Sequence, residues 1–174
     1  HPEDAVEVAR YIKSKGVLFD MKIIGNGEKR NLIEKLISKY ELSGCVQLSD
    51  FMPPNEIRKI MDETNVYLFT SGKQEGWGVV LNEAMNSGCA VIANSHAGSA
   101  PYLIEDRKSG FLYDGSTLSL QHAIDDLLHS NLSDVANKAY ETINNKWSPT
   151  IAAKNLLDFA KSLQYMPEGP CSMA

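Results

Sequence analysis

Apolar residues along the chain fall into two alternating patterns, which are short continuous runs and longer stretches with helical spacing. The short runs, which predict buried strands, cover 19–24, 46–48, 66–70, 90–94 and 111–113. Helical spacing at 2–15, 28–41, 55–61 and 79–87 separates most of these runs. Strands that alternate with helices in this way are typical of a parallel sheet covered by helices on both faces. The pattern therefore predicts an α/β fold with a Rossmann-like sheet.

The alternation ends at Gly115, and only helical patterns follow. They cover 118–128, 133–144 and 151–163, and we expect this helical C-terminal tail to pack across the domain. Residues 166–174 show no regular pattern and are expected to be loose.

The length of 174 residues suits one hydrophobic core, which predicts a single domain over residues 1–174. The chain opens inside a helical pattern with no strand before it, so we expect a truncated domain that lacks its first strand. Such a sheet should show unpaired strand edges or a gap near the strands at 19–24 and 66–70.

Composition and charge exclude several classes of function. The 17 basic and 22 acidic residues give a net charge of -5 without a basic stripe, which argues against a nucleic-acid partner. No apolar run approaches the roughly 18 residues of a membrane span, so we expect a soluble, cytoplasmic protein. Cys45, Cys89 and Cys171 are odd in number and lack the spacing of metal ligands, so neither a disulfide framework nor a metal site is predicted.

Candidate chemistry lies in the loops that follow the strands, because open parallel sheets bind ligands at the carboxyl ends of their strands. Gly25 and Gly27 follow the first strand run and lead into a helix, where they allow backbone to approach a ligand. Glycines that simply turn the chain would give the same pattern. The loop at 95–101 is built from small residues, and its His96 has no placed partner that would indicate a catalytic role.

The loop after the run at 66–70 carries the strongest functional pattern. Gly76 and Gly78 flank Trp77, and the helix that follows offers free amides suited to a diphosphate. Glu75 in this loop and Glu83 in the helix are separated by seven residues, so their carboxylates can accept hydrogen bonds from hydroxyls on both sides of the phosphates. The alternative is that both glutamates are ordinary solvated side chains.

The stretch 75–85, followed by 88–93, resembles the retaining glycosyltransferases of two-lobed GT-B fold, the glycosyl transferases group 1 family. The family signature is a pair of glutamates separated by seven residues. Similar matches at 23–27, 66–71, 98–101 and 110–112 extend the resemblance over about residues 19–113. The chain thus resembles the C-terminal, donor-binding lobe of such an enzyme.

The resemblance implies transfer of a sugar from a nucleoside diphosphate to an acceptor hydroxyl with retention, as in polysaccharide biosynthesis. No metal and no cofactor are implied, since the nucleoside-diphosphate sugar is itself the substrate. By resemblance, Glu83 holds the ribose hydroxyls and Glu75, the catalytic candidate, contacts the donor sugar. The amides of Gly76, Trp77 and Gly78 face the diphosphate and sugar, and Phe51 in the loop at 49–52 lies beside the base.

The chain also departs from the family pattern. The family's diphosphate-binding arginine and lysine precede the helix with which this chain opens, and Tyr102 stands where the family commonly has a glutamate. The N-terminal acceptor lobe is expected as a partner, with any peripheral membrane contact made through it. Because transfer needs both lobes, we expect the fragment alone to be inactive.

Three other functions remain open. A dinucleotide-dependent oxidoreductase would use the loop at 25–27 and Asp50, although Arg30 stands where its third glycine belongs. A sugar-nucleotide epimerase of the same two-lobed fold would bind similar ligands. A non-catalytic interaction module would leave both glutamates without a ligand.

Overall fold

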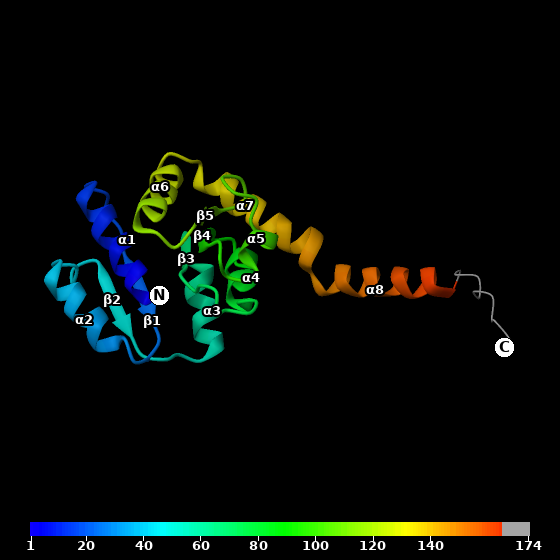
Figure 1. Ribbon diagram of the computed structural model, residues 1–174, viewed down its shortest axis with the longest axis horizontal. Helices are drawn as coiled ribbons and strands as arrows, with labels where there is room; N and C mark the ends of the chain where they lie inside the picture. Colours follow the sequence, from blue (N-terminus) through cyan, green and yellow to red (C-terminus); the bar gives the residue numbers. More distant parts are fainter. Residues whose placement is uncertain (165–174) are drawn as a thin grey trace, which may run out of the picture.

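The computed structural model describes residues 1–164, and the segment expected to be loose, together with Cys171, lies outside the described residues. Strands and helices alternate through the first two thirds of the chain (Figure 1). The elements are α1 (Pro2–Ser14), β1 (Met21–Ile24), α2 (Arg30–Lys39), β2 (Val46–Ser49), α3 (Pro54–Asp62), β3 (Val66–Phe69), α4 (Val79–Asn86), β4 (Ala90–Asn94), α5 (Ala100–Leu103), β5 (Phe111–Tyr113), α6 (Thr117–Leu128), α7 (Leu132–Thr142), the π-helical turn η1 (Ile143–Trp147) and α8 (Pro149–Gln164).

The strands form two parallel sheets within the described residues. β1 pairs with β2, with Ile23 opposite Leu48, and the second sheet has the order β3-β4-β5. No ladder joins β1 to β3 in this part of the chain, so each of these strands has one edge without a strand partner. The sequence predicted one sheet with a gap or unpaired edges near these two strands, and the division lies there.

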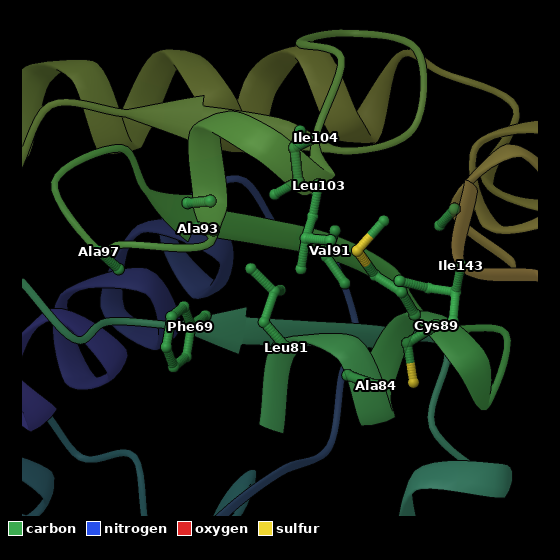
Figure 2. Packing of buried hydrophobic residues seen from close by; sticks show 13 residues of the cluster. Phe69, Leu81, Ala84, Cys89, Val91, Ala93, Ala97, Leu103, Ile104 and Ile143 are labelled. Carbon is green, nitrogen blue, oxygen red and sulfur yellow. The ribbon is translucent and has the colours of Figure 1, made fainter. Parts of the chain in front are cut away.

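Helices cover both faces of the three-stranded sheet, as predicted. All of β4 is buried, and its alternate side chains point into different clusters because successive residues of a strand face opposite sides. Val91 and Ala93 join a cluster with α4, α5 and α7 (Figure 2), whereas Ala90 and Ile92 join a cluster with α1 and α6. The two-stranded sheet has its own core, shared with α1 and α2.

The helix that follows α6 ends earlier than predicted. The helix predicted to reach residue 144 ends at Thr142 and continues as the π-helical turn η1. Ser148 then adopts an extended conformation (ψ 154°), which the following Pro149 favours because proline disfavours helical backbone in the residue before it.

The predicted packing of the helical tail is correct for α6 and α7 but wrong for α8. α6 lies on β5 and α1, and α7 lies on β4 and α4. α8 points away from the sheet (Figure 1), and Leu156, Leu157 and Phe159 are each at least 60% exposed. Helical periodicity defined the apolar positions of α8, but no surface of the described residues covers them.

Candidate functional site

The carboxyl ends of four strands meet around one cavity of about 680 Å³, a size typical of small-molecule sites. Lys29 comes from the end of the loop after β1, and the loop after β3 supplies 71–75. Asn94 ends β4, His96 follows it, and Gly115 follows β5. His1, which precedes α1, completes the wall. The position agrees with the rule for open parallel sheets.

Close contact between two loops shapes one wall of this cavity. The amide of Glu75 donates to the Gly72 carbonyl (2.9 Å), which closes a tight turn. The carbonyl of Glu75 accepts from Gly98 N (3.2 Å) in the loop after β4. A Cβ at Gly98 would lie 1.7 Å from the Gly76 carbonyl oxygen, so only glycine allows the loops to come this close.

The start of α4 also depends on a glycine. Gly78 caps the helix in the left-handed region (φ 79°, ψ 64°). A Cβ at this position would lie 2.3 Å from Cζ of Phe69, which is buried at the end of β3. Backbone conformation and packing therefore both require glycine here, and the glycine of the predicted signature is explained by local structure.

Charged groups from α1 and α2 meet at the edge of the cavity. Lys29 Nζ donates to Glu3 Oε1 (2.6 Å), and His1 Nδ1 lies 3.7 Å from the same oxygen. Burial acts to raise the pKa of Glu3, but the hydrogen bond from Lys29 and its charge outweigh this effect, so the net shift is downward. Lys73 is exposed on the wall formed by the β3 loop. The cavity thus combines two lysines with Glu75 in its lining.

Buried polar groups support the cavity at the ends of β4 and β5. Asn94 is 3% exposed, and its Oδ1 accepts from the backbone amide of His96 (3.0 Å). The Tyr113 hydroxyl donates to Asp4 Oδ2 (2.8 Å), which ties β5 to the first turn of α1. Burial, followed by the hydrogen bond to Asp4, raises the pKa of Tyr113 well above its usual range, so Tyr113 stays neutral and can donate.

The cavity includes only part of the site predicted from the sequence. Glu75 lines it, whereas Glu83 is exposed on α4 and does not. Phe51 is 79% exposed in the loop after β2, which excludes a core position. The other predicted residues lie in the expected loops but outside the lining of this cavity, and these are Gly25, Gly27, Gly76, Trp77 and Gly78.

Several lining residues were not among the predicted ones. Lys73 and Gly115 follow strand ends, so the rule that pointed to the other loops would also have found them. The same rule would have found Lys29, at the end of the loop after β1. His1 carries no such signal, because it reaches the cavity through the packing of α1 on the sheets.

The Asp50 carboxylate, needed by the oxidoreductase alternative for a ribose contact, pairs instead with Arg30 Nη1 at 2.8 Å. Among residues 1–164, no group of three or more histidine, cysteine, aspartate or glutamate side chains is placed to hold a metal ion. The described helices include none with the length and apolar character to cross a membrane.

The chain is similar in sequence to glycosyltransferases of polysaccharide biosynthesis. Over 168 residues the chain is 30% identical to WcaL of Escherichia coli K12, a candidate colanic acid biosynthesis glycosyltransferase, covering 91% of this chain and 41% of WcaL. It is 37% identical over 113 residues to the amylovoran biosynthesis glycosyltransferase AmsK of Erwinia amylovora, covering 62% of this chain and 28% of AmsK. The chain therefore spans less than half the length of these relatives.

Solved structures share the fold. The crystal structure of a variant of S. aureus TarM, in complex with fondaparinux, α-GlcNAc-glycerol and UDP, superposes with a TM-score of 0.77 at 24% identity, covering 91% of this chain and 32% of TarM. The C-terminal domain of the group 1 glycosyl transferase LpcC from Francisella tularensis superposes with a TM-score of 0.73 at 23% identity, covering 85% of this chain and 80% of that domain. The family model of the glycosyl transferases group 1 matches residues 1–146. With most of its length matched by that model, this chain belongs to the glycosyl transferases group 1 family.

Proposed function

We propose that this chain is the donor-binding lobe of a retaining glycosyltransferase, which moves a sugar from a nucleoside diphosphate to an acceptor hydroxyl. The observation that carries the proposal is the cavity at the carboxyl ends of the strands, lined by Glu75 of the signature and by basic residues. Two structural neighbours, TarM and the pneumococcal O-GlcNAc transferase GtfA, were crystallised in complex with UDP, which makes a uridine diphosphate sugar the first donor to test.

The cavity suits the two chemical parts of such a donor. Lys29, Lys73 and the start of α1 supply positive charge or positive dipole, which the diphosphate requires. Glu75 supplies an ionised acceptor for sugar hydroxyls. Since Glu3 holds Lys29 in this structure, an incoming phosphate would compete with the Glu3 carboxylate for that lysine.

The roles of the two glutamates follow from the family signature. We propose that Glu83 accepts hydrogen bonds from the ribose hydroxyls and that Glu75 contacts the transferred sugar. The exposure of Glu83 on α4 keeps its carboxylate accessible to a nucleoside that extends out of the cavity over the start of this helix. The acceptor would be held by a second lobe, in the part of the relatives that this chain does not match.

Calorimetric titration with UDP and UDP-sugars tests these roles. Hydrogen bonds to charged groups contribute about 1.5–3 kcal/mol each, so Glu83→Gln should weaken binding of both ligands tenfold or more. Glu75→Gln should weaken binding of the UDP-sugar and leave UDP nearly unaffected. Glu63→Gln, which changes an exposed glutamate at the end of α3, is the matched control. Equal losses for both ligands in both site variants would refute the assignment of roles, and an unaltered melting temperature with every nucleoside diphosphate would refute donor binding itself.

A further inference from the structure

Three aromatic side chains from separate elements lie side by side near the cavity. Trp77 belongs to the loop before α4, Tyr102 to α5 and Trp147 to the π-helical turn η1. The rings of Trp77 and Tyr102 stack with centroids 6.1 Å apart and 24° between their planes. The rings of Trp77 and Trp147 lie 5.3 Å apart at 48°. We call these three side chains the aromatic row.

The central ring of the row is firmly held. The Trp77 indole Nε1 donates to Asn82 Oδ1 (2.9 Å), and the ring packs against the buried cluster that contains Phe69 and Leu81. The outer rings are open to solvent, with Tyr102 68% exposed and Trp147 40% exposed. The row therefore exposes the rings of Tyr102 and Trp147 to solvent, while the Trp77 ring between them is held in place by the core.

The aromatic row shares two loops with the candidate donor site, although its three side chains lie outside the lining of the cavity. The Trp77 carbonyl accepts from Ser99 N (3.1 Å), and two residues earlier the Glu75 carbonyl accepts from Gly98 N (3.2 Å). The same pair of loops thus holds both Glu75 at the cavity and Trp77 in the row. A ligand that extends from the cavity along these loops would reach the aromatic rings.

Charged side chains lie at the rim of the row. Glu105 follows α5 and accepts a hydrogen bond from Lys108. This bond and the positive charge of Lys108 lower the pKa of Glu105, and the charges of Lys146 and Lys138 contribute more weakly. Lys146 directly precedes Trp147 in the chain. Glu105 lies three residues after Tyr102, and we call Glu105, Lys108 and Lys146, which adjoin the outer rings along the chain, the charged rim.

We propose that the aromatic row binds a saccharide chain, the acceptor or the product of the transfer. The apolar C–H faces of pyranose rings would pack on Tyr102 and Trp147, while the hydroxyls at the ring edges would reach the charged rim. This proposal rests on the proposed function, because the saccharide occupies a site adjoining the donor cavity. A docked protein surface is the competing occupant, and it would bury the row against a second protein lobe.

The row also depends on Tyr102, a residue at which this chain departs from the common family pattern. Tyr102 stands where the family commonly has a glutamate, and its ring supplies the most exposed surface of the three. A glutamate there would leave Trp77 without its stacking partner. The saccharide site would thus be a feature of this chain and of relatives that carry an aromatic residue at this position.

Tryptophan fluorescence reports directly on the proposed site, because Trp77 and Trp147 are the two tryptophans of the whole chain. We would titrate the 174-residue chain with cellotetraose, maltotetraose, β-1,4-galactotetraose and an oligogalacturonate tetramer up to about 10 mM. At least one should shift the emission saturably. Tyr102→Ala should weaken that binding about fivefold or more, and Tyr102→Phe, which keeps the ring, should weaken it less than twofold. Phe159→Ala, a change of an exposed ring on α8, is the matched control.

Parallel titration with UDP separates this proposal from the proposed function. Binding of UDP without any saccharide response overturns the saccharide site and leaves donor binding intact. A saccharide response that Tyr102→Ala leaves unchanged also overturns it, as does burial of the row against a second protein lobe in a structure of the longer protein. A saccharide response without UDP binding supports the site and counts against donor binding.

Discussion

The close approach of Gly98 to Gly76 allows a quantitative test of the two site loops. In Gly98→Ala the added Cβ would lie 1.7 Å from the Gly76 carbonyl oxygen and 2.7 Å from its carbon. Ordinary contact begins near 3.4 Å, so the loops must separate by about 1.7 Å. The neighbouring atoms are backbone, and no flexible side chain can move to relieve the clash.

The separation should break the two hydrogen bonds that join the loops, from Gly98 N to the Glu75 carbonyl and from Ser99 N to the Trp77 carbonyl. Each contributes about 1 kcal/mol, and the crowding itself adds about 1 kcal/mol or more. We therefore expect Gly98→Ala to lower the free energy of unfolding by about 3 kcal/mol. For a domain of this size the melting temperature should fall by about 6–12 °C.

Circular dichroism melts of the wild type, Gly98→Ala and Gly44→Ala provide the measurement. Gly44 has no atom within 4 Å of an added Cβ, so the same substitution there controls for alanine itself. Gly98→Ala should also weaken binding of the UDP-sugar, because Glu75, the proposed sugar contact, moves with its loop. A melting temperature within about 2 °C of that of Gly44→Ala would show that the two loops are not in contact and would refute this reasoning.

Three further predictions concern titrating groups. Burial raises the pKa of Asp4, so the free energy of unfolding falls as pH rises through the shifted pKa. Asp4→Asn can still accept the hydrogen bond from the Tyr113 hydroxyl, so its melting temperature should exceed that of wild type at about pH 7. This difference in melting temperature should shrink towards about pH 4. Equal differences at both pH values would contradict this. Burial raises the pKa of the Cys89 thiol to about 11, which keeps it from forming the reactive thiolate. In iodoacetamide labelling followed by mass spectrometry, Cys45 should therefore be labelled well before Cys89. Equal labelling rates of the two cysteines would count against the buried position of Cys89. Lys73→Gln should weaken UDP binding and reduce its salt dependence in titrations at two ionic strengths; an unchanged salt dependence would exclude a phosphate contact.

The sequence located the strands well because their apolar runs are unambiguous. β4 and β5 have the predicted bounds, since residues buried on both faces of a sheet leave a continuous apolar run with abrupt ends. The predicted helix at 28–41 was longer than α2, because helix ends depend on capping contacts that periodicity does not encode.

The candidate site was less predictable than the fold. The sequence pointed to Glu75 because its loop follows a strand and carries a compact signature, and Glu75 lies at the cavity, while its role stays a prediction. His1 lies at the cavity beside Gly72, although about 70 residues of sequence separate them, and only the packing of α1 on the sheets brings them together. No local pattern indicates such a long-range contact. The exposed direction of α8 was missed for a related reason, because periodicity shows which side of a helix is apolar without showing what covers it.

The π-helical turn has a mechanical consequence. α7 is anchored on β4 and α4, whereas α8 begins anew at Pro149 after the extended Ser148, so the two helices act as separate levers and not as one rod. Trp147 is the last residue of the turn between them, and its ring touches Trp77. Any change in the orientation of α8 therefore pivots beside Trp77, the tryptophan that precedes the signature helix. A displacement of α8 would act first on the loop that holds Glu75.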